Sequence, residues 1–364
     1  MTSIELVTLG EVADLQWGDT SVTKKSYVLT GGKYPAYSAS GQDGFLPYFD
    51  YDRTGVILSA IGANAGKTWL ATGKWSCIKN TIRFFSKDES VADTRYLYWA
   101  TQSHATFPLR GSAQPFISQG DAREVAISLP PISEQRAIAA TLGALDDKIE
   151  SNRRIIGLIP RLVRAHVNSA ISHSSTFISV SDLATFVNGG AYTKGATGTG
   201  RMVIRIAELN SGPGRSTVYN DIKVPDEKIA RAGDILMSWS GSLGVYRWYR
   251  DEAIINQHIF KVSPTGYPAW LVFDRLNEVM SVFRGVAADK ATTMGHIQRG
   301  HLISTNVEIP TQGALEELET KISPLWDRLL LAERENLDLE QLRDALLPEL
   351  LSGRIHVTAE GAEA

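Results

Sequence analysis

The sequence repeats itself once over nearly its whole length, and this repeat restricts the folds that the chain can adopt. Four short segments recur in the same order, at offsets of 171, 178, 180 and 180 residues. The matched pairs are LGEVA at Leu9–Ala13 with VSDLA at Val180–Ala184, GVILS at Gly55–Ser59 with GDILM at Gly233–Met237, PFISQG at Pro115–Gly120 with GHIQRG at Gly295–Gly300, and VAISLP at Val125–Pro130 with TNVEIP at Thr305–Pro310. Each match is short, but their common order and similar offsets predict two copies of one structural unit.

A heptad pattern follows each copy and predicts a long helix. In the first helix the seam residues are Ile138, Leu142, Leu145, Ile149, Asn152, Ile156, Ile159, Val163 and His166. Adding 180 gives the second seam, at Leu318, Ile322, Leu325, Leu329, Ala332, Asn336, Leu339, Arg343 and Leu346. Two amphipathic helices could each lie on their own domain, but narrow seams with charged flanks favour an antiparallel coiled coil.

The residues before each helix form short apolar or alternating runs between Gly- and Ser-rich turns, which is typical of strands. ADTRYLYWATQS and PAWLVFDRLNEVMSV predict one further helix in each copy. The predicted fold class is therefore α/β (α+β): two tandem mixed α/β domains, separated by two long helices packed as an antiparallel coiled coil, with pseudo-two-fold symmetry. The expected boundaries are 1–130 and 173–310 for the domains, 131–172 and 311–353 for the helices, and 354–364 for a flexible tail.

Composition narrows the class of protein. Cys77 is the single cysteine, so a disulfide framework and a cysteine zinc site are excluded. We expect a soluble, cytoplasmic protein, because the N-terminus lacks a signal pattern and no apolar run reaches the roughly 18 residues of a membrane span. The net charge is −3, but the last 54 residues alone hold 12 acidic and 5 basic side chains. The remainder is neutral to slightly basic, which is compatible with DNA binding.

The familiar catalytic motifs are incomplete in this chain. SAIGANAGKT at Ser59–Thr68 resembles a phosphate-binding loop, but it has three residues between Gly62 and Gly66 where the motif needs four. His296 and His301 lie near Arg299 without the carboxylates of a metal site. No Gly-x-Ser-x-Gly elbow is present. The sequence thus predicts neither a catalytic site nor a metal site.

Polar, glycine-punctuated loops occur at corresponding places in the two copies. Their Gln, Asn, Ser, Thr, Lys and Arg side chains are those that read base edges and hold phosphates. The candidate DNA-binding residues are Tyr37, Ser38, Ser40, Gln42, Asn64, Lys67, Lys79, Asn80 and Gln114 in the first copy, and Tyr192, Lys194, Arg201, Trp239, Ser240, Gln257, His258, Thr292, Thr293, Gln298 and Arg299 in the second. Taken singly, each loop could equally be an ordinary solvated loop. Their occurrence in both copies favours recognition.

Two segments resemble a known family. LPPISEQRAIAATLGALDDKI, at Leu129–Ile149, is similar to the central conserved region of specificity subunits of type I restriction–modification systems. GSAQPFISQGD, at Gly111–Asp121, resembles the segment that closes their target recognition domains. The succession of domain, helix, domain and helix extends the resemblance over nearly the whole chain. The second copy departs from the motif, with Gly313 and Ala314 in place of Ser133 and Glu134.

The resemblance implies a DNA sequence-specificity subunit without catalytic activity. Such a subunit binds an asymmetric bipartite target in double-stranded DNA, with one half-site for each recognition domain. It recruits two methyltransferase subunits, on which S-adenosylmethionine is expected, and motor–nuclease subunits join them. The chain itself would need no cofactor. Two other functions stay open: a scaffold that binds no DNA and uses its coiled coil and acidic C-terminal helix, and an enzyme in its own right.

Overall fold

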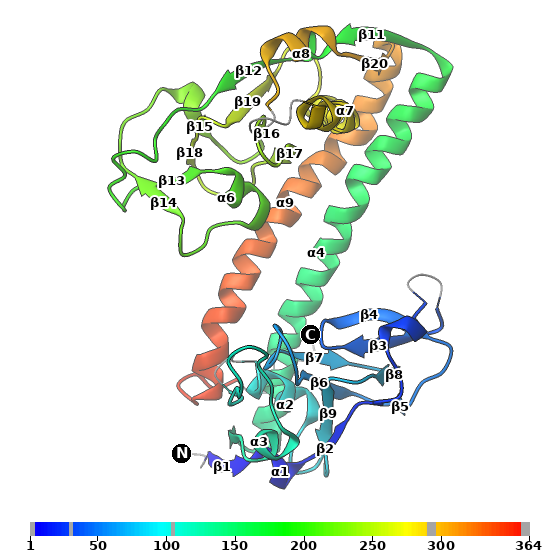
Figure 1. The fold of residues 1–364 in the computed structure, drawn as a ribbon, viewed down its shortest axis with the longest axis vertical. Helices are drawn as coiled ribbons and strands as arrows, with labels where there is room; N and C mark the ends of the chain where they lie inside the picture. Colours follow the sequence, from blue (N-terminus) through cyan, green and yellow to red (C-terminus); the bar gives the residue numbers. More distant parts are fainter. Residues whose placement is uncertain (1–3, 29–31, 103–105, 290–295, 358–364) are drawn as a thin grey trace. The chain divides into compact units, whose positions relative to one another are not determined.

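The computed structural model describes residues 4–28, 32–102, 106–289 and 296–357, which divide between two compact units. The first unit consists of Met1–Lys148 and Leu339–Ala364, and the second of Ile149–Asp338. Each unit contains sheets, short helices and part of each long helix (Figure 1). Within the described ranges, no helix is long and apolar enough to cross a membrane.

The first unit contains ten strands among its described residues, and these form three sheets. They are β1 (Glu5–Thr8), β2 (Ala13–Trp17), β3 (Tyr34–Ser38), β4 (Gly41–Leu46), β5 (Tyr51–Asp52), β6 (Gly55–Ser59), β7 (Thr68–Ala71), β8 (Lys74–Cys77), β9 (Thr81–Ser86) and β10 (Ala126–Leu129). The sheet orders are β2-β9-β6-β7, β4-β3-β8-β5 and β1-β10. Its short helices are α1 (Leu9–Val12), η1 (Lys24–Ser26), α2 (Thr94–Ala100) and α3 (Gln119–Arg123).

Strand β6 is central in its sheet and explains why the sequence there is apolar throughout. All five residues of Gly55–Ser59 are buried, as expected when both faces of a strand are covered. Val56 and Leu58 belong to the cluster that packs on α2 and the long helices, whereas Ile57 packs against Trp75 and Cys77 on the other face. The sheet with strand β6 thus separates two apolar layers.

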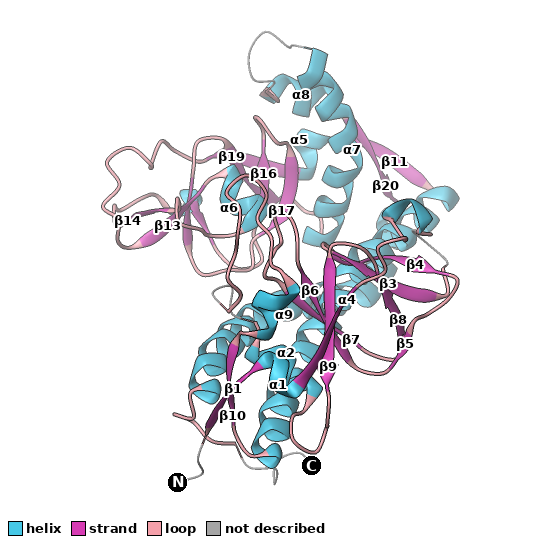
Figure 2. Cartoon of the chain, turned by 60° about the horizontal axis from the view of Figure 1, so that its bottom comes forward, coloured by secondary structure: helices cyan, strands magenta, loops and turns pink. Residues whose placement is uncertain are grey.

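The second unit repeats this organisation with ten strands of its own in the described ranges. Figure 2 distinguishes strands, in magenta, from helices, in cyan. They are β11 (Ser175–Ser179), β12 (Ala184–Asn188), β13 (Arg201–Ile204), β14 (Val218–Asn220), β15 (Ile229–Ala230), β16 (Ile235–Ser238), β17 (Gly244–Arg247), β18 (Ala253–Ile255), β19 (Ile259–Pro264) and β20 (Asn306–Pro310). The accompanying helices are α5 (Val180–Leu183), α6 (Ile206–Ser211), η2 (Asp226–Lys228), α7 (Ala269–Asp289) and α8 (Arg299–Ser304). The sheet orders are β12-β19-β16-β17, β14-β13-β18-β15 and β11-β20, strand for strand those of the first unit.

The predicted duplication is therefore confirmed at the level of topology, but one of the four sequence matches was out of register. Aligning GVILS with GDILM equates Ile57 with Ile235. In the sheets, however, Val56 pairs with Phe84 as Ile235 pairs with Val262, so the true offset in this strand is one residue larger. Because side chains alternate between the faces of a strand, the slip would place every residue on the wrong face. The shared glycine at the start of each segment caused the error.

Helices α4 (Ile132–His173) and α9 (Gln312–Leu351) pair antiparallel within each unit, as predicted. In the first unit Arg343 Nη1 donates to Asp146 Oδ1 at 2.8 Å. In the second, Asn152 Nδ2 donates to Glu335 Oε2 at 2.8 Å and Asn336 Nδ2 donates to the carbonyl of Ile149. All eighteen predicted seam residues are buried or half-buried. The pseudo-two-fold relation between the units stays a prediction.

The thiol of Cys77 gives a direct test of the packing in the first unit. Its side chain is 1% exposed, and burial raises its pKa to about 12, so little reactive thiolate forms at neutral pH. We expect an alkylating reagent at pH 8 to leave the native protein unmodified and to label it once after denaturation, as measured by intact mass spectrometry. Adding an exposed thiol with Thr72→Cys should give one rapid label. Equal labelling rates for Cys77 and that new thiol would refute the packing.

Candidate nucleic-acid interface

Three polar loops of the first unit lie side by side, although they are far apart in the sequence. Asn64 Nδ2 donates to the carbonyl of Ala39 at 3.1 Å, which joins the loop before β7 to the turn after β3. The backbone N–H of Gly62 donates to the carbonyl of Pro115 at 2.9 Å, which joins it to the loop before α3. These bonds gather the predicted residues of all three loops in one region.

The turn between β8 and β9 joins the same region. The carbonyl of Asn80 accepts from the backbone N–H of Ala60 at 3.0 Å. Asn80 has a φ of 72°, the left-handed conformation that asparagine tolerates better than most residues. Its neighbour Lys79 is exposed beside the turn. Four loops thus contribute to one polar surface of the first unit.

The predicted residues of the first unit differ in how much they expose. Ser38 is 2% exposed and donates to Asp43 Oδ2 at 2.7 Å. Tyr37 packs edge-on against Trp75, and burial raises the pKa of its hydroxyl. Both are placed to support the turn rather than to reach a ligand. The exposed members are Ser40, Gln42, Lys67, Lys79 and Gln114.

In the second unit, the equivalent surface is built on an aromatic cluster. Trp239 lies against Phe260, His258 and His296, with ring centroids 5.9, 5.5 and 5.9 Å away. The backbone N–H of Trp239 donates to the carbonyl of His258, and its own carbonyl accepts from the N–H of Ile297. Ala60 makes the same two backbone bonds, to Asn80 and Ile117. The loops of the two units are therefore held by the same pattern of backbone hydrogen bonds, but they carry different side chains.

Other predicted residues of the second unit are engaged in its own structure. Tyr192 is half-buried against the cluster around Val203. Arg201 Nη1 lies 2.9 Å from Glu252 Oε1, so its charge is balanced within the unit. Lys194, by contrast, is exposed. Thr292 and Thr293 lie outside the described residues.

Arg299, at the start of α8, borders a groove of about 480 Å³ along strand β12. Lys228 lines the same groove and bonds to the carbonyl of Asn188. Gln298 is exposed just before Arg299. Two cations therefore flank one groove. The sequence carries no local signal of the position of Lys228, because only the packing of η2 against β12 places it on the groove that Arg299 borders.

Arg284 was also missed by the sequence. It lies on α7 and donates to the carbonyl of Leu243 at 3.0 Å, in the loop that follows β16. Together with Asn210 and Tyr246 it lines a polar hollow of about 560 Å³. An arginine on an amphipathic helix carries no local signal of such a position, because only the packing of α7 on β17 creates it.

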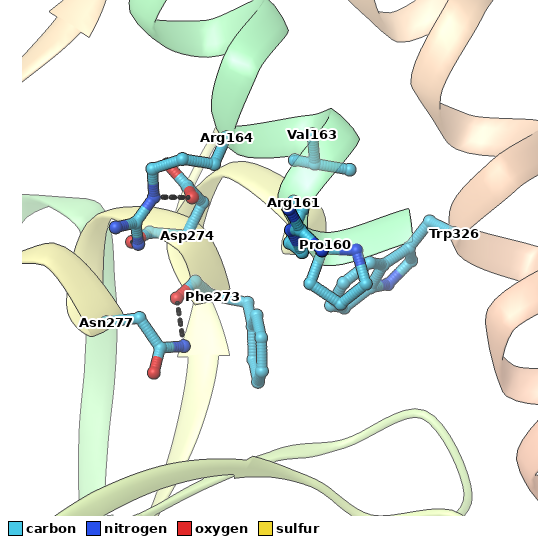
Figure 3. A pocket seen from close by; sticks show the side chains of 8 residues that line it. All are labelled: Pro160, Arg161, Val163, Arg164, Phe273, Asp274, Asn277 and Trp326. Carbon is cyan, nitrogen blue, oxygen red and sulfur yellow. Dashed lines mark hydrogen bonds and ion pairs between the residues drawn. The ribbon is translucent and has the colours of Figure 1, made fainter. Parts of the chain in front are cut away.

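A separate, largely apolar pocket of about 450 Å³ lies where α4, α7 and α9 meet in the second unit (Figure 3). Pro160, Phe273 and Trp326 contribute its apolar walls. Three of its four polar side chains bond within the protein: Arg164 Nε donates to Asp274 Oδ1 at 2.7 Å, and Asn277 Nδ2 donates to the carbonyl of Phe273. Among the described residues, no group of three or more His, Cys, Asp or Glu side chains is placed to hold a metal ion.

Comparisons with known proteins agree with this architecture. Residues 1–161 match the family described as type I restriction modification DNA specificity domain. The chain is 27% identical over 161 residues to the type I restriction enzyme EcoDI specificity subunit of Escherichia coli, covering 43% of this chain and 34% of that protein. It thus matches about a third of the length of that relative. It is 19% identical over 341 residues to the MjaIX specificity subunit of Methanocaldococcus jannaschii, covering 83% of this chain and 78% of that one.

Among solved structures, the S subunit of a type I restriction–modification system from M. genitalium has a similar fold. The TM-score is 0.71 at 16% identity, and the match covers 96% of each chain. At this identity the similarity concerns the fold alone. The resemblance inferred from the LPPISEQ segment is confirmed by the family match over residues 1–161.

Proposed function

We propose that this chain is the subunit that selects the DNA target of a type I system, because residues 1–161 match the family of type I restriction modification DNA specificity domains. In this proposal it binds double-stranded DNA at an asymmetric, bipartite sequence. The main support is the duplicated loop framework. Two units of equal topology gather polar loops in equivalent places, yet present different side chains there. Two unlike half-sites are the natural targets of such a pair.

The division of labour along the chain follows from the same proposal. Residues 1–130 and 173–310 serve as the two target recognition domains. The helices within 131–172 and 311–353 serve as the spacer, and residues 354–364 as a tail. Bases would be read by the exposed side chains of the loops, while buried members such as Ser38 would hold the loops in shape.

We further propose that the chain performs no chemistry itself. Two methyltransferase subunits with S-adenosylmethionine would modify the target, and motor–nuclease subunits would join the complex. Helices α4 and α9 offer the surfaces for assembly, since their seams face each other and leave outward side chains accessible, among them the exposed Leu158, Leu331 and Leu342. The acidic residues of the last segment would face solvent or a basic partner rather than phosphate.

A salt series tests the proposal and separates it from the scaffold alternative. The chain with its methyltransferase subunit should bind target duplex with an affinity that falls steeply as salt rises. Each lysine that neutralises a phosphate contributes about 0.9 to the slope of log affinity against log salt. We therefore expect Lys67→Ala and Lys79→Ala each to reduce the slope by about 0.9, as measured by gel shift.

Lys74 supplies a matched control, because it lies at the start of β8 whereas Lys79 follows its end. Lys74→Ala should leave the slope unchanged. A scaffold would show no steep salt dependence with any of these variants. An enzyme in its own right would convert DNA with a methyl donor in the absence of partner subunits, which we do not expect.

A further inference from the structure

Three polar side chains are hydrogen-bonded in series in the second unit, where the turn between β18 and β19 meets the loop after β16. Ser240 Oγ lies 3.0 Å from His258 Nδ1, and Gln257 Nε2 lies 3.2 Å from His258 Nε2. Ser240 is 3% exposed, His258 is half-buried and Gln257 is exposed. The three side chains therefore run from the interior to the surface, with the imidazole in the middle.

The imidazole of His258 is held in place from several sides. Its ring packs against Trp239, which is itself packed against Phe260 and His296. The backbone carbonyl of His258 accepts from the backbone N–H of Trp239 at 3.2 Å. A ring fixed by aromatic neighbours and by a buried hydroxyl presents its outer nitrogen in a constant direction.

This arrangement determines which atoms of Gln257 remain available. An amide nitrogen can only donate, so His258 Nε2 must accept, and His258 Nδ1–H then donates to Ser240 Oγ. The amide of Gln257 keeps its oxygen and its second N–H. These form a neighbouring acceptor and donor, the pair that matches the N6 amino group and N7 of adenine in the major groove.

We propose that Gln257 reads an adenine in the half-site bound by the second unit, and that His258 is the positioning residue that fixes its amide. This inference rests on the proposed function and adds a base and two residue roles to it. The first unit has Lys79 and Asn80 at the corresponding turn, because the carbonyls of Asn80 and His258 accept the same backbone bond. The two half-sites therefore differ at this position.

The test uses the chain assembled with its methyltransferase subunit and a duplex library randomised in both half-sites. Bound duplexes are recovered and sequenced. The wild-type complex should require adenine at one position that becomes unrestricted in Gln257→Ala, with a loss of discrimination of about 10- to 100-fold. Gln257→Glu should shift the preference to cytosine, because a carboxylate accepts from the cytosine N4 amino group.

Variants at His258 separate positioning from a general effect on folding. His258→Ala should relax the same position although Gln257 is intact. His258→Gln, whose amide oxygen can accept in place of Nε2, should restore the preference. Lys79→Ala, which removes a proposed phosphate contact, should weaken binding to all sequences while leaving the adenine preference intact. In every variant the unaffected half-site reports that the complex is folded.

Two results would overturn the inference: an unchanged adenine preference in Gln257→Ala, or equal relaxation of both half-sites. Failure of the proposed function would look different, because the wild-type complex would then enrich no sequence at all.

Discussion

A four-residue insertion in α4, between Asn152 and Ile156, should reduce binding of the native target to the non-specific level, about 10³-fold or more. The insertion adds about 6 Å of helix and moves every later seam residue off the heptad. It separates the bond of Asn152 to Glu335 from the apolar contacts that follow, around Ile159 and Val163. If the helices set the spacing of the half-sites, the native spacing no longer fits. Gel shift against duplexes of graded half-site spacing measures the effect.

A matched variant keeps the seam and changes only the length. One heptad inserted in both α4 and α9, at facing positions beside Asn152 and Asn336, preserves the helix pairing and adds about 10 Å. We expect tight binding to return on a duplex whose half-sites are about three base pairs further apart, since each base pair adds about 3.4 Å. Binding of the four-residue variant at native spacing would contradict the role of the helices as a spacer.

Arg247→Met should lower the free energy of unfolding of the second unit by about 3 to 5 kcal/mol, the usual effect of removing one partner of a buried ion pair. Arg247 is 2% exposed at its side chain and lies 2.6 Å from Glu333 Oε2. It also donates to the carbonyl of Trp326 at 2.8 Å and lies over the Trp326 ring. Its loss leaves Glu333, 15% exposed, without a counter-charge. Urea denaturation followed by tryptophan fluorescence measures the change.

The pH dependence of this variant has a defined sign. Burial holds the pKa of Glu333 above its ordinary value even beside Arg247, and removal of the guanidinium raises the pKa further. An acid whose pKa is raised on folding contributes stability below its unfolded pKa and loses it as pH rises through the folded pKa. The deficit of Arg247→Met should therefore be smaller near pH 4.5 than near pH 7.5. The double variant with Glu333→Gln should recover most of the loss and remove the pH dependence.

Much of the architecture could be read from the sequence, because periodicity reports directly on burial. The seam residues were found even where they are polar, as at Asn152 and Asn336, since position in the heptad and not residue type defines them. The register of the strands was harder to predict from the sequence. The offset in β6 and β16 depends on which face each residue occupies, and an apolar run buried on both faces carries no alternation to reveal it.

The candidate site was predictable only in part. Loop composition identified Gln257 and His258, but not the hydrogen bond to Ser240, which needs the pairing of β16 with β19. Loop composition does not distinguish Tyr37 and Ser38 from the exposed residues of the same loop, although both are packed inward. Exposure within a loop depends on the sheet beneath it, and this information is spread over segments far apart in the chain.

The first unit has a consequence for how the protein is made. Leu346, Leu347 and Leu350, near the end of α9, pack into the same core as Ile138 and Leu142. A ribosome synthesises Ile149–Asp338 before it reaches them. At that moment all residues of the second unit have been synthesised. The first unit, although begun earlier, still lacks the apolar side chains that the end of α9 contributes to its core. We expect the nascent chain to expose that incomplete core to chaperones until the last turns of α9 emerge. A premature stop codon that removes these turns should therefore destabilise the first unit.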